Sequence, residues 1–379
     1  MRPLACLAAL GTCAIAAEVL PKGQVVDRVV CSGEERQSYA LYLPAQYAPE
    51  RTWPILYCLD PDAGGRIPVE RFAEAARRVG WIVVGSNNSR NGPLDIAREA
   101  IRWMIQDTHQ RFSIDDSQIY TAGFSGGARL ALAWAARNRV AGVIACGAGF
   151  SAGAIPNRVR FRIYATAGVD DFNFDEVYAM NRELYRRGFP QRFSEFAGGH
   201  DWLPENMTAN ALEFLSGGLP PEPPPPVSPA RKKTAERYAR LTEEITGSDD
   251  AARRFLVQAL RRDAQRPEDG VNRRAARRVL AGSFVSSIEQ GNELLAANKY
   301  PEAARLWQLA VLLRPAYAEG WYSLAVSEAG AHEKRRALEA LEQAVVNGFR
   351  DQDRIAREPL LEPLRKEPRY AAAIAGIAK

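Results

Sequence analysis

The sequence predicts an α/β domain followed by an all-α domain, on three observations. Apolar β-rich runs alternate with helix-periodic runs from Val25 to Leu215. This alternation is typical of a mainly parallel sheet with helices on both faces. A proline-rich stretch then interrupts the chain at Gly217–Lys233, and the patterns beyond it are helical throughout.

The bulk composition indicates packed domains and a mixed surface charge. The chain has 379 residues, of which 46% are hydrophobic, and a formal net charge of +5. This length predicts two or three domains. Charges of both signs are numerous and no base-stacking aromatic pattern accompanies them, so we expect no nucleic-acid partner.

The segment 1–17 has the features of a secretory signal peptide. Arg2 supplies the charged start, Leu4–Ile15 a short apolar core, and Ala14-Ile15-Ala16 a cleavage site. The core is well short of the roughly 20 apolar residues that a membrane helix needs. We therefore expect a secreted or periplasmic protein without a membrane span; a lipoprotein anchored through Cys13 is the alternative.

Eight strands are expected in the first domain, residues 18–218. The connection between the first two is too short for a crossover helix, which predicts an antiparallel hairpin. Three of the strands each hold a cysteine, and this odd number without paired spacing predicts buried thiols: Cys31, Cys58 and Cys146. The expected strands are Val25–Cys31, Ser38–Leu43, Trp53–Leu59, Trp81–Gly85, Ile119–Phe124, Val140–Cys146, Arg160–Ala165 and Arg192–Phe196.

Helix-periodic runs lie between several of these strands, and a last helix closes the domain. Such runs between successive strands are expected to form the crossovers of a parallel sheet. They are Val69–Val79, Leu94–Gln110, Ala128–Arg137, Phe174–Arg187 and Glu205–Leu215.

The second half of the chain begins with a linker at 219–229. Its prolines cannot sit in a helix or a central strand, and they predict an extended, semi-rigid spacer throughout Gly217–Lys233. A helical connecting segment is expected at 230–283, followed by a helical domain at 284–379.

A repeat of 34 residues runs through the last domain, since Ala303, Trp307 and Ala310 recur as Ala337, Leu341 and Ala344. This pattern resembles the tetratricopeptide repeat. The resemblance implies helix pairs that cross closely at small residues, and a surface that can take a protein partner. Ordinary helical hairpins are the alternative.

Three glycines surround Ser125 between a strand-like and a helix-like run. A dinucleotide-binding turn would follow the first strand, would need a glycine where Arg129 stands, and would need an acidic residue about 20 positions later. None of these conditions is met. Gly123-Phe124-Ser125-Gly126-Gly127 instead fits the G-x-S-x-G nucleophile elbow, with the strand before it and the helix after it that this motif requires.

A serine nucleophile needs a base, and the base needs a carboxylate to orient it. His109 closes a helix and a third histidine lies in the repeats, whereas His200 is on a loop between the last strand and the last helix. Asp171 follows the preceding strand, with its neighbour Asp170 as the alternative. The order serine, aspartate, histidine is that of the α/β-hydrolases.

Three stretches together resemble secreted α/β-hydrolase esterases: the elbow, "AGVDDFN" and "FAGGHDW". The similar groups are the poly-hydroxyalkanoate depolymerase and feruloyl esterase-like group and the carboxylesterase/phospholipase group. The resemblance covers Val25 to Leu215. It implies the α/β-hydrolase fold, with Ser125 as nucleophile, His200 as base and Asp171 as acid.

The chain departs from these families where they carry His-Gly after the third strand. Asp60-Pro61 stands there, and Pro61 has no N–H. By position, we expect the backbone N–H groups of Asp62 and Gly126 to form the oxyanion hole. A carboxylate at Asp60 or Asp62 would oppose an oxyanion unless it points away or is paired, with Arg66 as the candidate partner.

The implied activity is cleavage of small-molecule or polymeric carboxylic esters through an acyl-enzyme. No metal or cofactor is required for this chemistry. Four aromatic residues beside the motif loops are expected to line an apolar substrate pocket: Phe124, Phe150, Phe172 and Trp202. The alternative function is a catalytically weak or inactive hydrolase scaffold that acts mainly in protein–protein interaction through its repeats.

Overall fold

The computed structural model describes residues 20–150 and 155–377, so the expected signal peptide lies outside the described residues. The chain divides into two compact units, one ending at Tyr120 and the other beginning at Thr121. This division falls inside one strand, β5 (Ile114–Phe124). Among the described residues, none of the helices is long and apolar enough to cross a membrane.

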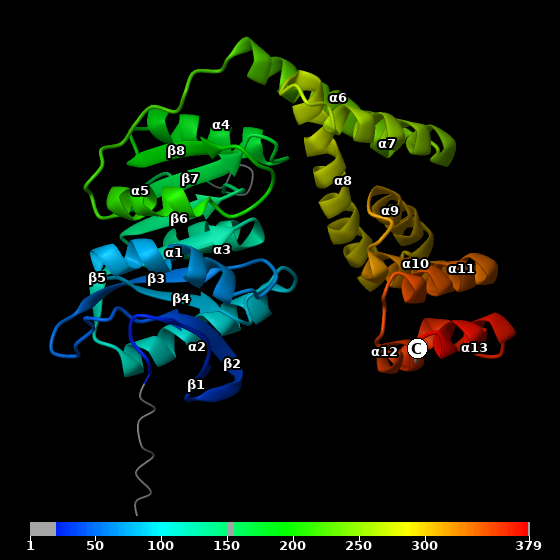
Figure 1. Cartoon of the computed structure of the whole chain (residues 1–379), viewed down its shortest axis with the longest axis horizontal. Helices are drawn as coiled ribbons and strands as arrows, with labels where there is room; N and C mark the ends of the chain where they lie inside the picture. The colour runs from blue at the N-terminus through cyan, green and yellow to red at the C-terminus, as the bar shows by residue number, and fades with distance from the viewer. Residues whose placement is uncertain (1–19, 151–154, 378–379) are drawn as a thin grey trace, which may run out of the picture. The chain divides into compact units, whose positions relative to one another are not determined.

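Eight strands form a sheet of order β1-β2-β4-β3-β5-β6-β7-β8 (Figure 1). The hairpin of β1 and β2 is antiparallel, and β2 also runs antiparallel to β4. The pairs β3–β4, β6–β7 and β7–β8 are parallel. This confirms the predicted α/β-hydrolase architecture. The strands are β1 (Val25–Cys31), β2 (Glu34–Tyr42), β3 (Trp53–Leu59), β4 (Ile82–Ser86), β5, β6 (Gly142–Cys146), β7 (Arg162–Gly168) and β8 (Gln191–Phe196).

The first unit adds α1 (Arg66–Val79) and α2 (Leu94–Arg111) to its strands. Helix α1 packs the face that carries Val69 and Phe72 into the core, and it ends at Gly80, which takes the left-handed conformation at φ 73°. It begins three residues before the predicted start. Strand β5 likewise begins at Ile114, five residues before the predicted start. The prediction missed this part because Asp115–Gln118 are polar and partly or fully exposed, a pattern that is more typical of a turn.

In the second unit, β6, β7 and β8 form the sheet together with the end of β5. Strands β6 and β7 are buried on both faces, as expected for parallel strands covered by helices, whereas the edge strand β8 alternates between buried and partly exposed residues. The covering helices are α3 (Gly126–Ala135), α4 (Phe174–Arg186) and α5 (Glu205–Leu215). The predicted buried thiols are confirmed, since Cys31, Cys58 and Cys146 are all buried.

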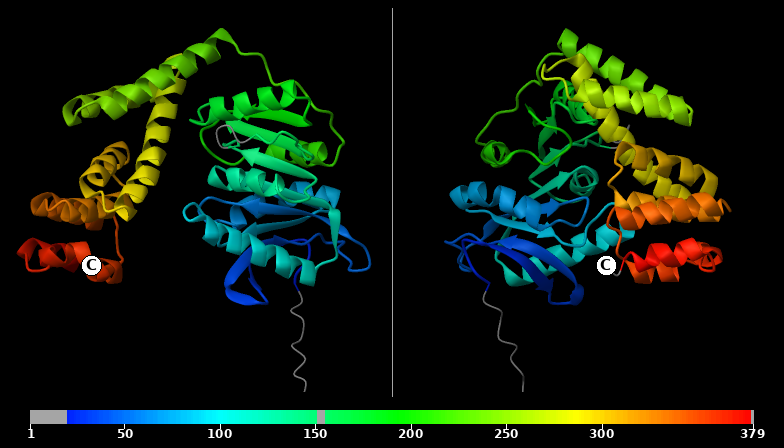
Figure 2. Two further views of the ribbon diagram at one scale, coloured as in Figure 1. Left: turned by 180° about the vertical axis from the view of Figure 1, so that it is seen from behind. Right: turned by 45° about the vertical axis from the view of Figure 1, so that its right-hand side comes forward.

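The second unit continues as an all-α region, as predicted (Figure 2). Its longest helix, α8, has 26 residues. The helices are α6 (Pro229–Gly247), α7 (Asp250–Ala264), α8 (Val271–Ala296), α9 (Tyr300–Leu313), α10 (Ala318–Gly330), α11 (Lys334–Val346), α12 (Gln352–Arg357) and α13 (Pro368–Ala375), with a 3₁₀ turn at Pro359–Leu364.

The prediction that Gly217–Lys233 would hold no helix is wrong at its end. Helix α6 begins at Pro229, with Ser228 as its N-cap. Proline is tolerated at the first helical position because the N–H that it lacks would have no partner there. The preceding residues do lack regular structure, yet they are tied to β8: Glu222 accepts from the Gln191 side chain at 2.7 Å, and its carboxylate pairs with Arg192.

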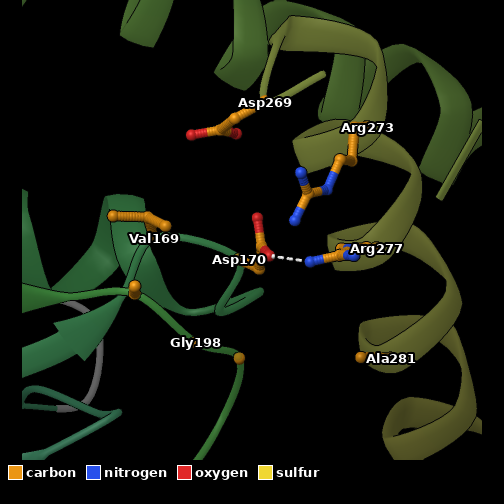
Figure 3. Close-up of a pocket in the computed structure, with 9 residues that line it drawn as sticks. Val169, Asp170, Gly198, Asp269, Arg273, Arg277 and Ala281 are labelled. Carbon is orange, nitrogen blue, oxygen red and sulfur yellow. Dashed lines mark hydrogen bonds and ion pairs between the residues drawn. The ribbon is translucent and has the colours of Figure 1, made fainter. Parts of the chain in front are cut away.

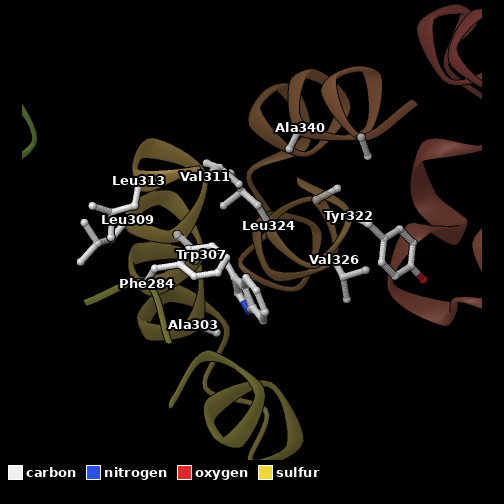
Figure 4. Close-up of a cluster of buried hydrophobic side chains, with 14 of the residues drawn as sticks. Phe284, Ala303, Trp307, Leu309, Val311, Leu313, Tyr322, Leu324, Val326 and Ala340 are labelled. Atoms are coloured by element: carbon white, nitrogen blue, oxygen red, sulfur yellow. The ribbon is translucent and has the colours of Figure 1, made fainter. Parts of the chain in front are cut away.

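The core of the all-α region combines large apolar side chains (Figure 4) with small residues at the repeated positions. Ala303, Ala310, Ala337 and Ala344 are fully buried, and Trp307 fills the space beside Gly291, where a Cβ would lie 2.9 Å from the indole nitrogen. Helices α9 and α11 begin at residues 300 and 334, a spacing of 34. The assignment to tetratricopeptide repeats stays a prediction.

Candidate active site

Ser125 occupies a sharp turn between β5 and α3. Its backbone has φ 53° and ψ −121°, a conformation that side chains other than glycine rarely adopt. A Cβ at Gly123 would lie 2.2 Å from the carbonyl oxygen of Gly127, so the strand and the helix can approach only with glycine there. The Ser125 amide donates to the carbonyl of Cys146 at 2.9 Å, which ties the turn to the end of β6.

The three residues expected to act together lie in hydrogen-bond contact. Ser125 Oγ is 2.8 Å from His200 Nε2, and His200 Nδ1 is 2.9 Å from Asp171 Oδ1. A carboxylate can only accept, so Nδ1 carries the proton and Nε2 accepts from the serine hydroxyl. In this tautomer the imidazole can take the serine proton.

Asp171 is held in place by its own loop. Its side chain is completely buried, and Oδ1 also accepts from the Asn173 amide at 2.8 Å. Among the described residues, Oδ2 has no hydrogen-bond partner. Asp170, the alternative acid, is bound elsewhere, because its Oδ2 pairs with Arg277 of α8 at 2.7 Å (Figure 3).

The loop that carries His200 crosses directly over the end of β7. A Cβ at Gly168 would lie 2.3 Å from the carbonyl oxygen of Gly199, so the crossing requires glycine. The amide of Asp170 donates to the carbonyl of Gly198 at 2.8 Å. The loop that carries Asp171 (the acid loop, Val169–Asp175) and the loop that carries His200 are therefore connected, so that a shift of one is expected to move the other.

Aromatic rings enclose the imidazole. The ring centroids of Phe124 and Phe172 lie 4.6 and 4.2 Å from that of His200, and Trp202 lies 6.1 Å from Phe124. These three residues of the predicted pocket are thus brought together. Phe150 is buried, and its amide faces the sulfur of Met180 on α4 at 3.4 Å. Excluding water from around the histidine strengthens its hydrogen bonds.

The two predicted oxyanion donors differ in whether their backbone N–H already has a hydrogen-bond acceptor. Gly126 opens α3, so its N–H has no acceptor within the helix. The Asp62 amide, in the first unit, donates to Asp60 Oδ1 at 3.0 Å. Burial and the neighbouring Asp60 carboxylate raise the pKa of Asp62. Arg66 does not serve as their partner, because it pairs with Asp27 and Glu70.

One network near the elbow was not predicted from the sequence. Both terminal nitrogens of Arg129 bind the carboxylate of Glu176 on α4, at 2.7 and 2.8 Å. The same carboxylate accepts from the Gly149 amide at 3.0 Å. In the sequence, Arg129 served only as evidence against a dinucleotide-binding turn. An arginine two residues after Gly127 gives no sign of a partner 47 positions away in the chain.

The remaining histidines have other surroundings, and the described residues offer no evident metal centre. His109 Nδ1 lies 2.8 Å from the carbonyl of Ile105 in its own helix. His332 takes a left-handed conformation, φ 63°, in the turn between α10 and α11. Within residues 20–150 and 155–377, no group of three or more histidine, cysteine, aspartate or glutamate side chains is placed to hold a metal ion.

No protein-family model matches the chain, and no curated protein matches it. Solved structures do resemble about half of it. Fluorophosphonate-binding serine hydrolase F of Staphylococcus aureus is 15% identical over 52% of this chain and 99% of its own, with a TM-score of 0.42. A ferulic acid esterase is 18% identical over 51% and 97%, with a TM-score of 0.43.

A third similar structure is the feruloyl esterase module from Clostridium thermocellum. It is 14% identical over 52% of this chain and 89% of its own, with a TM-score of 0.41. At these identities and TM-scores the likenesses carry no argument about the chemistry of this chain.

Proposed function

We propose that the chain is a serine hydrolase that cleaves carboxylic esters, with Ser125 as nucleophile, His200 as general base and Asp171 as the orienting acid. The observation that supports this is the continuous chain of hydrogen bonds from Ser125 Oγ through His200 to a fully buried carboxylate. A strained serine backbone at the same point is a second sign of a functional site.

The proposed reaction is a two-step acyl transfer. His200 Nε2 takes the proton of Ser125 as its oxygen attacks the ester carbonyl. The Gly126 N–H is the proposed donor to the oxyanion, because it opens a helix whose dipole also favours negative charge. The protonated histidine then gives its proton to the leaving alcohol. In the second step His200 takes a proton from water, the resulting hydroxide attacks the acyl-serine, and the carboxylic acid leaves as Ser125 regains its proton.

The proposed substrates are esters with an apolar acyl or aryl group, either small or polymeric. Phe124 and Phe172 pack against the imidazole of His200 and are the proposed apolar surface for such a group, and the buried ring of Trp202 packs against Phe124. The assignment of Asp62 as a donor remains a proposal with a condition: its amide must leave Asp60 Oδ1 to serve an oxyanion.

Labelling by a fluorophosphonate probe tests this proposal. The unmodified protein should be labelled and should hydrolyse at least one p-nitrophenyl, aryl or hydroxyalkanoate ester. Ser125→Ala should abolish labelling and lower kcat by on the order of 10⁴-fold or more, because no nucleophile remains. Ser117→Ala, which removes an exposed serine of β5, is the control and should change neither.

Two results would count against the proposal. One is a folded unmodified protein that is neither labelled nor active across the ester panel. The other is labelling that persists in Ser125→Ala, which would place the reactive group elsewhere in the chain.

A further inference from the structure

Helix α8 of the all-α region contacts the loop that carries the proposed acid. The buried guanidinium of Arg278, 2% exposed, donates twice to the carbonyl of Val169, at 2.8 and 3.2 Å. Its remaining terminal nitrogen pairs with Asp175 Oδ2 at 3.0 Å. Asp171 lies between Val169 and Asp175 in the chain, so one arginine holds both ends of the segment that presents it.

A second arginine of α8 holds the residue next to the proposed acid. Arg277 Nη1 lies 2.7 Å from Asp170 Oδ2, and the Asp170 side chain is only 10% exposed (Figure 3). The helix does not close completely on the loops, since a cavity of about 470 Å³ remains beside Gly198 and Arg273. The contact is therefore made by specific side chains and not by continuous apolar packing.

A third contact reaches the histidine itself through an aromatic ring. Gly282, one turn beyond Arg278, faces Phe172: a Cβ at Gly282 would lie 3.0 Å from the Cβ of Phe172. The ring of Phe172 in turn packs against the imidazole of His200, at 4.2 Å between centroids. Any side chain at position 282 would push Phe172 toward the proposed base.

Arg278 is costly to bury, which argues that its contacts hold the loop firmly. Burial lowers the pKa of Arg278 and raises that of Asp175, so both groups give up hydration to reach each other. Such a pair is tolerated only when its hydrogen bonds are satisfied together. The Phe174 ring, 4.7 Å from the guanidinium, completes the enclosure. Movement of the acid loop would leave a buried charge without partners.

We propose that Arg278 is a positioning residue for the triad: α8 of the all-α region holds the Val169–Asp175 loop so that Asp171 and Phe172 keep the His200 ring aligned. The all-α region is then part of the hydrolytic machinery and not an independent module. This inference deepens the proposed function, and it rests on that function for its kinetic test only.

Arg278→Gln in the full chain tests the proposal. We expect kcat to fall 10- to 100-fold with KM nearly unchanged, because a misaligned base reduces the stabilisation of the transition state and leaves substrate binding in the ground state unaffected. The low-field proton resonance of His200 Nδ1–H should broaden or vanish. Arg274→Gln is the matched control, since Arg274 lies one turn earlier on α8 and its guanidinium binds Asp269 of the same region. It should leave both readouts unchanged.

Two further variants keep the test decisive if Arg278→Gln does not fold. Arg278→Lys keeps the charge and should restore part of kcat. Gly282→Ala should lower kcat severalfold although alanine favours a helix. Gly247→Ala is its control, because a Cβ there meets nothing within 4 Å.

Unchanged kcat and an unchanged His200 resonance in folded Arg278→Gln would overturn the inference. So would equal effects of Arg274→Gln, which would indicate a general loss of stability. Failure of the proposed function gives a different result: the unmodified protein would then be inert toward esters, while the His200 resonance would still respond to Arg278→Gln.

Discussion

Gly147 shows how closely the backbone approaches Asp171 and His200, the proposed acid and base. It follows β6 with φ +65°, and a Cβ there would lie 3.0 Å from Asp171 Oδ2 and 3.1 Å from His200 Nδ1. The Asn173 side chain also donates to its carbonyl, at 2.8 Å. A glycine is therefore required at this position both for its conformation and for the space that it leaves.

Gly147→Ala should lower kcat by about 10- to 100-fold, because the added methyl group displaces the aspartate–histidine pair. The free energy of unfolding should fall by about 1 kcal/mol or more, from the left-handed backbone alone. Gly188→Ala separates the two effects, since Gly188 has φ +73° and nothing within 4 Å of a Cβ. It should lose similar stability and keep full activity; equal kcat in the two variants would refute the crowding argument. Ester hydrolysis and thermal unfolding measure both quantities.

Asp107 of the first unit is a buried carboxylate with three strong donors. Tyr39 Oη, Arg111 Nε and the Ser32 amide each lie 2.7 Å from its oxygens. Burial alone would raise the pKa of Asp107, but these hydrogen bonds outweigh it and hold the pKa below its ordinary value. A pKa lowered in the folded state stabilises the protein above the unfolded pKa of about 3.9, and this stabilisation is lost as pH falls through the folded value.

Asp107→Asn should therefore lower the free energy of unfolding by about 3 kcal/mol at pH 7, since it removes the charge that pairs with Arg111 and replaces one acceptor oxygen by an NH₂ group that faces buried donors. The difference from the unmodified protein should shrink as pH falls below about 4, where the unfolded carboxylate takes up its proton, and further through the lower pKa of the folded state. Chemical denaturation at several pH values measures it. Asp116→Asn, at an exposed position, should have little effect at any pH. A loss that stays constant down to pH 3 would contradict the assignment.

At the residue level, the sequence predicts those site residues that belong to short local motifs. Glycines 123 and 127 predicted the turn at Ser125, and the loops after two strands pointed to Asp171 and His200. The choice between Asp170 and Asp171 was beyond the sequence, because it depends on Arg277, 107 positions away. The sequence also gives no sign that arginines of α8 contact this loop, because no periodicity distinguishes a buried arginine from an exposed one.

At the level of elements, Arg129 and Glu176 join three segments of the site. Arg129 lies in the first turn of α3, Glu176 in the first turn of α4, and Gly149 in the loop after β6. The two side chains are 35% and 37% exposed, so solvent screens much of their attraction. Their value lies in bidentate geometry, which holds the start of α4 near the elbow.

A double-mutant cycle of Arg129→Met and Glu176→Gln should give a coupling energy of about 1 kcal/mol in unfolding. It should decrease with added salt, as expected for a partly exposed pair. Arg137→Met combined with Glu176→Gln serves as the control, because Arg137 donates to its own helix. Coupling as large in that control cycle would show that the pair is not specific.

Element boundaries were harder to predict than the elements themselves. The alternation of apolar runs predicted all eight strands, since parallel strands buried on both faces are strongly apolar. The start of β5 was missed because Asp115, Ser117 and Gln118 form a polar network that satisfies them locally. The helical segment expected from residue 230 begins at Pro229, but the proline-rich spacer was extended to Lys233 because proline was taken as a helix breaker, whereas Ser228 and Pro229 begin a helix.

At the level of the whole chain, the prolines before α6 are not a free spacer. The Tyr178 hydroxyl of α4 donates to the Pro225 carbonyl, and Glu222 is held by β8. Arg231 of α6 then lies over the rings of Phe174 and Tyr178, at 5.1 and 4.6 Å. Composition predicts the absence of regular structure in such a stretch, but not the contacts that anchor it. The domain limits, the secretory signal and a protein partner for the repeats remain predictions.

The strained turn at Ser125 has a consequence for how such a gene would change over time. Its backbone conformation costs of order 1–3 kcal/mol with any side chain, and glycine would avoid that cost. A gene copy released from selection for the proposed hydrolysis would gain stability by exchanging this serine for glycine. Descendants that have lost the proposed activity are therefore expected to carry glycine at position 125. Serine is expected to persist where that activity is still under selection.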